Sequence, residues 1–501
     1  MTQPGRVYLV GSGPGDPGLL TLRAAQLLAE ADVVLYDYLV NPQVLSHARA
    51  GAELVCLGRH GRDRVMPQTE INERMIQAAG GGKCVVRLKA GDSIVFARAA
   101  EEIEILEAAG VPYEIVPGIT AALAVGSYAG IPLTHGLSAS AVALVTGQER
   151  EDKSAPGLDY GALATFPGTL VFYMGVTTAK RWTAALILAG KSSATPAAIV
   201  RRCSWPDQQT IPCTLGTVAD EIEARHLRPP ALVIVGAVAA TREGQDWFSA
   251  RPLSGQRIVV TRPAHQSSEF MLALSNLGAL VHSQPAIEIG PPDDWAPVDA
   301  AIARIADFDW LVFSSVNGVR ALLDRLLAHR DLRALGGLRL AAIGPGTADE
   351  LARYHLRADL VPSDYRAESL AAALAQAAAP ASRFLLVRAS RGREILAEEL
   401  SKHAAEVEQV VVYSSRDVLE PDPEVLGQLR GGAIDWITVT SSAIARSLVR
   451  MFGNDLRGAK LASISPVTSE TLRSLGFDVA AEAEQYTTAG LIKAILRSSE
   501  R

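Results

Sequence analysis

Short apolar runs typical of β-strands alternate with helical patterns along the whole chain, which has 501 residues. This alternation predicts an α/β fold, in which helices cover sheets built from the strands. So long a chain exceeds what one compact core holds, and we therefore expect two to four domains. Thr21 and Thr69 each precede a helical pattern and are predicted helix N-caps. The runs predicted as strands in the first half are 7–10, 33–36, 85–88, 141–145, 170–173, 197–200 and 231–235.

A polar, turn-rich stretch at 241–256 divides the chain. A new strand pattern, Arg257-Ile-Val-Val-Thr-Arg-Pro263, follows it, as at the start of a domain. We therefore predict a first half at 1–245, a linker at 246–256 and a second half at 257–501.

The second half contains an internal echo. Phe308-Asp-Trp-Leu-Val-Phe-Ser-Ser315 resembles Ile434-Asp-Trp-Ile-Thr-Val-Thr-Ser441, and each is followed by a second strand and turn, at 342–348 and 463–469. Repeated strand–turn–helix units predict two similar α/β lobes facing a cleft. Chance similarity between α/β units is the alternative.

Composition excludes several classes of partner. The formal net charge is −6, so we expect no general polyanion-binding surface and no nucleic-acid partner. The four cysteines lack metal-ligand spacing, and we expect no metal. The chain shows neither a signal-peptide pattern nor an apolar run of about 20 residues, which predicts a cytoplasmic protein without a membrane partner. An acidic substrate would have to be bound by local basic side chains.

The first strand runs into a turn dense in glycine and proline, Gly11-Ser-Gly-Pro-Gly-Asp-Pro-Gly18. Glycine permits positive φ and a close approach to a ligand, so we interpret the turn as a ligand-binding loop. A plain strand–helix connection is the alternative, although it needs fewer such residues. Gly11, Gly13 and the later Asp37 also fit part of a dinucleotide-binding G-x-G-x-x-G pattern. Asp16 at the third glycine position, together with two prolines that lack N–H donors, argues against that pattern.

Further strand ends carry short polar motifs. They are Arg87-Leu-Lys-Ala-Gly91-Asp92, Val116-Pro-Gly118-Ile-Thr120-Ala121, Gly130-Ile-Pro-Leu-Thr-His135 and Leu170-Val-Phe-Tyr-Met174-Gly175. In doubly wound sheets, ligands bind beyond the carboxyl ends of the strands, so we expect these segments to converge on one site.

Together with the glycine turn and Tyr36-Asp37, these motifs resemble the tetrapyrrole (corrin/porphyrin) methyltransferase family over about residues 5–245. Within it they are most similar to S-adenosyl-methionine uroporphyrinogen-III C-methyltransferases. The resemblance implies two α/β subdomains, about 1–117 and 118–245, with S-adenosyl-methionine between them, and a homodimer. The family's catalytic carboxylate falls on Asp37. The implied cofactor-binding residues are Pro14, Ala90, Gly91, Asp92, Val95, Thr120, Ala121, Met174, Cys203 and Ala231.

Four places depart from the family pattern. Ala90 and Ser93 stand for glycine and proline around Gly91-Asp92, Arg59 for a lysine, Gly136 for an arginine and Cys203 for a glycine. Arg59 holds a predicted catalytic position, but arginine gives up a proton less readily than lysine.

The implied substrate, uroporphyrinogen, is rich in carboxylates, which arginine binds well. Arg62, Arg64 and Arg98 are therefore candidate substrate ligands. A solvated surface role is the alternative for each of them.

Residues 257 to about 493 resemble uroporphyrinogen-III synthase. The motifs are Thr261-Arg-Pro263, Phe313-Ser-Ser-Val-Asn-Gly318, Ile343-Gly-Pro-Gly-Thr347, Val412-Tyr413, Thr440-Ser441 and Ile464-Ser-Pro-Val-Thr468. The resemblance implies cyclisation of hydroxymethylbilane without a cofactor, between lobes at about 257–288 plus 418–497 and 289–417. Tyr413 matches the family's catalytic acid candidate. The candidate substrate-binding residues are Arg262, Ser315, Thr347, Arg388, Arg391, Ser441 and Thr468, for which a plain turn role is the alternative.

The two implied activities form one sequence of reactions, because the product of the second half is the substrate of the first. We therefore predict a bifunctional enzyme that adds two methyl groups to uroporphyrinogen III, giving precorrin-2 for sirohaem or cobalamin. A methyltransferase of another precorrin carbon is one alternative. A methyltransferase joined to a non-catalytic, synthase-like binding module is another.

Overall fold

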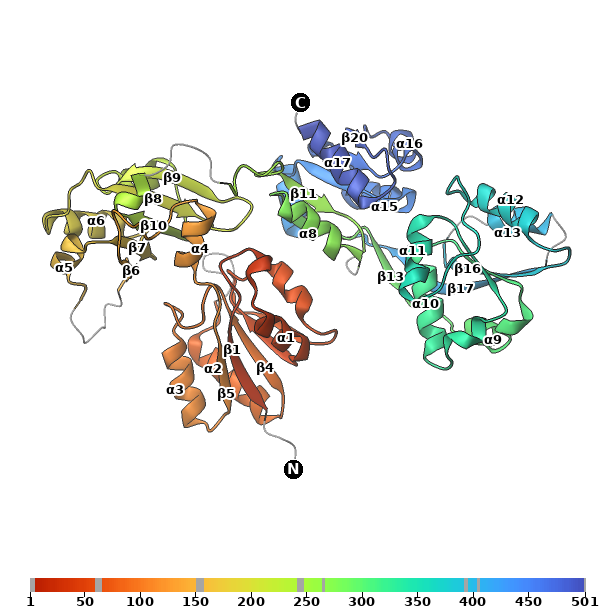
Figure 1. The fold of residues 1–501 in the computed structure, drawn as a ribbon, viewed down its shortest axis with the longest axis horizontal. Coiled ribbons are helices and arrows are strands. Elements are labelled where there is room, and N and C mark those ends of the chain that lie inside the picture. Colours follow the sequence, from red (N-terminus) through yellow and green to blue (C-terminus); the bar gives the residue numbers. More distant parts are fainter. Residues whose placement is uncertain are drawn as a thin grey trace. The chain divides into compact units, whose positions relative to one another are not determined.

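The computed structural model describes residues 5–58, 65–149, 157–240, 247–263, 266–391, 395–402 and 406–499. The chain forms two compact units, Met1–Arg257 with Met271–Val281, and Ile258–Phe270 with His282–Arg501. Each described sheet has five strands (Figure 1). Helices pack on these sheets, so the predicted α/β class is confirmed.

The first sheet is entirely parallel, in the order β3-β2-β4-β1-β5. Helix α1 packs on one face, and α2 and α3 pack on the other. The edge strand β3 was missed by the apolar pattern, and the other edge strand, β5, was marked only by its end at Val116; both carry exposed or half-exposed residues. The elements are β1 (Arg6–Gly11), α1 (Leu22–Glu30), β2 (Val33–Tyr36), β3 (Glu53–Cys56), α2 (Gln68–Gly80), β4 (Cys84–Lys89), α3 (Ala99–Ala108) and β5 (Tyr113–Val116).

The second sheet is mixed, in the order β6-β7-β10-β8-β9, with β6 and β7 parallel and the other neighbours antiparallel. Helix α4 covers one face, and α5, α6 and α7 cover the other. The missed strand β9 is again an edge strand, interrupted by Pro212. The elements are α4 (Ala121–Tyr128), β6 (Val142–Thr146), α5 (Tyr160–Thr165), β7 (Thr169–Tyr173), α6 (Ala179–Leu188), β8 (Pro196–Arg201), β9 (Gln209–Thr214), α7 (Val218–Ala224) and β10 (Ala231–Val235).

The third sheet has the order β12-β11-β18-β19-β20 and joins segments from both ends of the second half. Strands β11, β18, β19 and β20 are parallel neighbours. The elements are β11 (Arg257–Val260), α8 (Ser268–Asn276), β12 (Leu280–Ser283), α14 (Pro423–Arg430), β18 (Trp436–Val439), α15 (Ser442–Phe452), β19 (Lys460–Ser463), α16 (Pro466–Ser474), β20 (Ala481–Glu482) and α17 (Thr488–Ser499).

The fourth sheet has the order β13-β17-β16-β14-β15, in which only the edge strand β13 is antiparallel to its neighbour. The elements are β13 (Ile287–Gly290), α9 (Ala296–Ala303), β14 (Trp310–Phe313), α10 (Val316–Leu327), β15 (Arg339–Ala342), α11 (Pro345–Arg353), α12 (Ala367–Ala377), β16 (Arg383–Ala389), α13 (Ile395–Ser401) and β17 (Glu406–Asp417). Short 3-10 helices complete the fold: η1 (Pro17–Leu19), η2 (Pro42–His47), η3 (Ala237–Ala240), η5 (Ile305–Asp307), η6 (Leu332–Leu335) and η7 (Gly453–Gly458).

The internal echo corresponds to a repeated strand–turn–helix unit. Ser315 caps α10 by accepting from Gly318 N at 3.0 Å, and Ser441 caps α15 by accepting from Ile444 N at 3.2 Å. The serines therefore cap helices at equivalent positions of the third and fourth sheets.

One predicted N-cap is confirmed and the other is wrong. Thr21 Oγ1 accepts from Ala24 N at 3.2 Å at the start of α1. Helix α2 instead begins at Gln68 with Pro67 in the capping position, which leaves Thr69 inside the first turn. Proline fixes φ before the helix, so α2 starts earlier than the hydroxyl pattern indicates.

Residues 247–257 and Met271–Val281 belong to the first unit by their contacts. Leu253 N donates to Leu277 O at 2.8 Å, and Leu280 N donates to Gln256 O at 2.8 Å. Phe248 and Leu253 are buried. The contacts thus assign Met271–Val281, which lies beyond the predicted linker, to the first unit. The domain limits at 245 and 257 stay a prediction.

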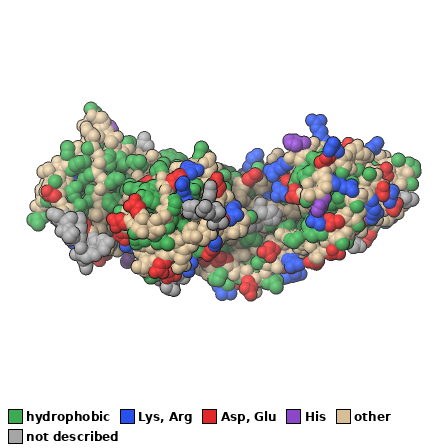
Figure 2. All heavy atoms as spheres, turned by 90° about the horizontal axis from the view of Figure 1, so that it is seen from below, with side chains coloured by type: hydrophobic (Ala, Val, Ile, Leu, Met, Phe, Trp, Pro, Cys, Tyr) green, Lys and Arg blue, Asp and Glu red, His purple; other side chains and the backbone are tan. Residues whose placement is uncertain are grey.

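Within the described residues, no helix is long and apolar enough to cross a membrane. No group of three or more His, Cys, Asp or Glu side chains in that part of the chain could hold a metal ion. Figure 2 shows acidic and basic side chains interspersed over the visible face.

Candidate functional site

Three strands of the first sheet, β1, β4 and β5, end in glycine-containing loops that touch each other. Gly13 and Gly91 exchange backbone hydrogen bonds of 3.0 and 2.7 Å. A Cβ on Gly11 would lie 2.6 Å from Gly118 N, and a Cβ on Gly118 would lie 2.3 Å from Gly91 O. The backbones therefore approach more closely than any side chain permits.

Gly91 requires glycine for another reason. Its φ is +72°, and a Cβ there would meet nothing closer than Ala121 N at 3.8 Å. Open space above this backbone, next to the N-terminus of α4, leaves room for a ligand against the chain itself.

Asp92 joins two of these loops. Its Oδ1 accepts from Ile94 N at 2.9 Å and Val95 N at 3.2 Å, and its Oδ2 accepts from Gly118 N at 3.0 Å. Ser93, one of the departures from the family pattern, is buried and donates to Val116 O at 3.3 Å. Both side chains hold the loops in place.

Tyr173, at the end of β7, ties the second sheet to the start of α4. Its hydroxyl accepts from Ala122 N at 2.8 Å and lies 2.6 Å from Thr120 Oγ1. Burial raises the pKa of Tyr173, so the phenol stays neutral. The next residue, Met174, has φ +52° and a half-exposed side chain. The structure thus brings Thr120, Ala121 and Met174 into one neighbourhood.

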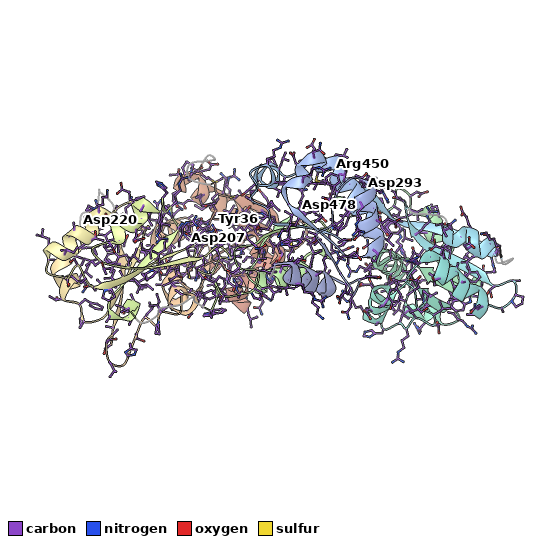
Figure 3. The ribbon with its side chains drawn as sticks, turned by 90° about the horizontal axis from the view of Figure 1, so that it is seen from above. Tyr36, Asp207, Asp220, Asp293, Arg450 and Asp478 are labelled. Carbon is purple, nitrogen blue, oxygen red and sulfur yellow. The ribbon has the colours of Figure 1, made fainter. Side chains whose placement is uncertain are left out.

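The loop between β8 and β9 packs on the glycine turn. Asp16 N donates to Ser204 Oγ at 3.1 Å, next to the buried Cys203. A Cβ on Gly15 would lie 2.3 Å from the indole nitrogen of Trp205. Figure 3 marks Asp207, whose carboxylate pairs with Arg202 at 2.6 Å in this loop.

Asp16 anchors the glycine turn. Its Oδ1 accepts from Gly18 N at 2.8 Å, and its Oδ2 accepts from the Tyr128 hydroxyl at 2.8 Å. Burial, and then the bond to Asp16, raises the pKa of Tyr128. Asp16 thus fixes the turn's shape.

Asp37 follows Tyr36 at the end of β2, and Figure 3 marks Tyr36. Arg87 Nη2 lies 2.6 Å from Asp37 Oδ1. Arg87 Nε and Lys89 Nζ both contact the buried carboxylate of Glu102, at 3.1 and 2.5 Å. Burial, followed by the charge of Arg87, lowers the pKa of Lys89. We call Asp37, Arg87, Glu102 and Lys89 the β4 charge network.

Sequence reasoning missed Arg87, Lys89 and Glu102 as parts of this site. A signal was present, since Cys84-Val-Val-Arg-Leu-Lys89 places two cations on alternate positions of an otherwise apolar strand. Such side chains are rarely buried unless they are paired.

Of the predicted arginines of the first half, only Arg98 lies in the part of the chain that the structure describes. Arg59, Arg62 and Arg64 lie outside the described residues. Arg98 donates to Glu101 at 3.1 Å and is largely exposed. Ala231 opens β10 and pairs with Arg201.

In the second unit, a hollow of about 480 Å³ lies beside β17 and α10. Its lining includes Tyr413, Asn317, Arg320 and Trp295. The Tyr413 hydroxyl lies 3.0 Å from Ser315 Oγ. Burial raises the pKa of Tyr413, against hydrogen bonds from Ser315 and Asn317 that lower it.

Hydrogen bonds through the side-chain amide of Gln266 connect Arg262 to Asn317, which lines this hollow. Arg262 Nη2 lies 3.4 Å from Gln266 Oε1, and Gln266 in turn donates to Asn317. Burial and the neighbouring charge of Arg320 lower the pKa of Arg262. Arg320 is itself neutralised by Glu350, at 2.6 and 2.9 Å. Arg262, unlike Arg320, has no carboxylate within ion-pair distance among the described residues.

The remaining predicted residues have local partners. Arg391 pairs with Asp417 at 2.8 Å, and Arg450, marked in Figure 3, pairs with the same carboxylate at 2.5 Å. Arg388 Nη1 donates to Gln409 at 3.0 Å. Thr347 and Thr468 are buried, and Thr468 Oγ1 lies 3.1 Å from Ser465 Oγ.

The fold and these sites define a chain of two α/β units, each with a candidate ligand site. One is organised around a glycine-lined strand edge beside a carboxylate, and the other around a buried tyrosine at a hollow.

Comparison with known proteins gives the family. Residues 6–219 match the family of Tetrapyrrole (Corrin/Porphyrin) Methylases, and residues 268–493 match Uroporphyrinogen-III synthase HemD. Porphyrin biosynthesis protein HemD of Ruminiclostridium josui is 32% identical over 96% of this chain and 94% of its own. The chain belongs to this family, in which a tetrapyrrole methylase half is fused to a HemD-type uroporphyrinogen-III synthase half, and the predicted resemblance is confirmed.

Other relatives match one half. An S-adenosyl-L-methionine-dependent uroporphyrinogen III methyltransferase of Methanosarcina barkeri is 46% identical over 47% of this chain and 92% of its own. The uroporphyrin-III C-methyl transferase of Thermus thermophilus, solved with S-adenyl homocysteine, is 40% identical, covers 48% of this chain and 96% of its own, and has a TM-score of 0.41. The chain spans about half the length of the siroheme synthases that it also matches.

Proposed function

We propose that the second half cyclises hydroxymethylbilane to uroporphyrinogen III, and that the first half methylates this product twice to give precorrin-2. The observation that carries the proposal is the fusion itself, matched along nearly the whole chain by one relative. A tetrapyrrole methylase and a uroporphyrinogen-III synthase in one chain act on the same macrocycle.

The glycine-containing loops after β1, β4 and β5 suit S-adenosyl-methionine, which supplies an activated methyl group on its sulfonium. The open backbone at Gly91 and the start of α4 offer N–H and carbonyl groups to such a ligand. Tyr173 and Asp92 hold these loops so that little reorganisation is needed on binding. The predicted cofactor residues Pro14, Ala90, Gly91, Thr120, Ala121 and Met174 stay our candidates for direct contact.

Asp37 is the proposed base. Arg87 binds one of its oxygens, and Oδ2 accepts no hydrogen bond from the described residues. This oxygen can take the proton that the macrocycle loses, from a position other than the newly methylated carbon, to balance the addition of a methyl cation.

Tyr413 is the proposed acid of the synthase half. A phenol with a raised pKa keeps its proton and can donate it to the hydroxyl that leaves hydroxymethylbilane as water. Arg262 is the proposed ligand of a substrate carboxylate, because its charge lies partly buried beside Gln266 and Asn317.

The full chain tests the proposal directly. Incubation with hydroxymethylbilane and S-adenosyl-methionine should give a product with two added methyl groups, and omission of S-adenosyl-methionine should give uroporphyrinogen III. Slow formation of the type I isomer alone would leave the second half as a binding module. A methyl count other than two, or a different acceptor, would favour methylation of another precorrin carbon.

Four further assignments belong to the proposal. The methylase half forms a homodimer, the product enters sirohaem or cobalamin synthesis, and the protein works in the cytoplasm. The synthase half uses no cofactor. Light scattering of the full chain tests the dimer.

A further inference from the structure

Strand β4 buries two cations in an apolar layer. Arg87 and Lys89 are 4% and 2% exposed, on the same side of the strand as Val85, which packs against α2 and α3. Buried charges are unfavourable unless partners compensate them. Because burying two charges costs free energy that apolar side chains would not, we look for a role of Arg87 and Lys89 beyond packing.

Glu102, on α3, supplies the compensation. It is fully buried and accepts from Arg87 Nε at 3.1 Å, Lys89 Nζ at 2.5 Å and Gln68 Nε2 at 3.1 Å. One carboxylate therefore faces two cations, and a positive charge is left over. Asp37, whose side chain is 35% exposed, provides the second negative charge at 2.6 Å from Arg87.

This geometry controls which oxygen of Asp37 is occupied. With Nε bonded to Glu102 and Nη1 donating to Leu88 O at 3.2 Å, the planar guanidinium has a fixed orientation and reaches Asp37 Oδ1 through Nη2. Without Glu102, the guanidinium keeps only the neutral carbonyl of Leu88 as an anchor, so it can rotate and bind a carboxylate through two parallel hydrogen bonds. Such a bidentate pair would engage both oxygens of Asp37.

We infer that Glu102 is a positioning residue for methyl transfer: by anchoring Arg87, it keeps one oxygen of Asp37 available to take the substrate proton. Glu102 itself touches no substrate. The inference rests on the proposed function, in which Asp37 is the base.

The first test compares Glu102→Gln with Glu104→Gln in the full chain. Glu104 lies on the same helix but is exposed, so it controls for loss of an acidic side chain. Glu102→Gln should lower the single-turnover methylation rate about tenfold to a hundredfold, since small misplacements of a reacting group cost this much. The affinity for S-adenosyl-homocysteine and the synthase rate should match those of Glu104→Gln.

The second test separates positioning from general support of the fold. Each variant is combined with Asp37→Asn. If Glu102 acts through Asp37, Glu102→Gln slows the Asp37→Asn enzyme no further, whereas a purely structural role makes the two losses multiply. Multiplying losses, or a Glu102→Gln rate equal to that of Glu104→Gln, would overturn the inference.

Arg87→Lys is measured in parallel, because Glu102→Gln leaves two buried cations less compensated and can impair folding. Lysine keeps the charge, but a single ammonium replaces the rigid fork that spans both carboxylates. The same loss in rate, again absent in the Asp37→Asn background, is expected. A wild-type chain that transfers no methyl group to uroporphyrinogen III refutes the proposed function instead, whatever the variants do.

Discussion

The two halves hold their proposed reactive groups in opposite ways. In the methylase half, Asp37 belongs to the β4 charge network, where four ionisable side chains neutralise one another. In the synthase half, Tyr413 is a buried neutral hydroxyl that lies 3.0 Å from Ser315 Oγ. The difference follows the proposed chemistry, because a base must be an anion before it acts and an acid must keep its proton.

The two sites also differ in what forms them. In the methylase half, the loops after β1, β4 and β5 present mostly backbone, because a Cβ added at Gly11 or Gly118 would clash with the neighbouring loop. The synthase hollow has residues with large side chains in its lining, among them Tyr413, Arg320 and Trp295. Substitutions should therefore separate the two activities cleanly.

The largest expected effect is on the charged site. Asp37→Asn keeps the shape but removes the base, and should lower methylation about 10²–10⁴-fold. Uroporphyrinogen III formation from hydroxymethylbilane should be unchanged. Mass spectrometry of both products from one reaction measures this, and full methylation by the variant would exclude Asp37 as the base.

The matching change in the neutral site is Tyr413→Phe. Loss of the acid should slow cyclisation by about 10- to 100-fold, while methylation of supplied uroporphyrinogen III continues at the wild-type rate. Isomer analysis by chromatography is the readout. Unchanged type III formation would move the acid role to another group.

Arg262→Gln tests whether the synthase hollow needs a cation. We expect the KM for hydroxymethylbilane to rise about tenfold with a smaller change in kcat, because a charged hydrogen bond to a substrate carboxylate is lost. Arg446→Gln, an exposed change on α15, is the control. Equal KM values for the two variants would contradict the assignment.

A smaller effect is expected from Tyr128→Phe in the methylase half. The change removes the hydroxyl that binds Asp16 at 2.8 Å and so loosens the glycine turn. One hydrogen bond of about 1 kcal/mol predicts a roughly fivefold rise in the Kd for S-adenosyl-homocysteine. Calorimetry measures it, with Tyr160→Phe on α5 as the control.

The smallest effect should be that of pH on the synthase. Burial raises the pKa of Tyr413 above its usual 10.0, so the phenol keeps its proton below that pH and loses it only as pH rises through the higher value. The ratio of wild-type to Tyr413→Phe rates should therefore stay constant between about pH 7 and 9. A falling ratio in that range would show a lower pKa.

Much of the fold was predictable because it rests on local patterns. Buried strands such as β1, β2 and β4 were found from their apolar runs. The edge strands β3 and β9 were not, because one side of an edge strand faces solvent and its residues are mixed. Thr69 was misjudged since the preceding proline, and not the hydroxyl, sets the start of α2.

The sequence by itself determined the α/β class, the order of the two halves and the candidates Asp37 and Tyr413, because motif residues lie next to one another in the chain. Only the tertiary structure revealed that Glu102, Arg87 and Asp37 form one network, and that Gln266 links Arg262 to Asn317. Asp37 follows β2, Arg87 lies on β4 and Glu102 on α3, while Asn317, on α10, is far along the chain from Arg262 and Gln266. Burial explains the pairing of Arg87, Lys89 and Glu102, since a charge removed from water is unfavourable without a partner.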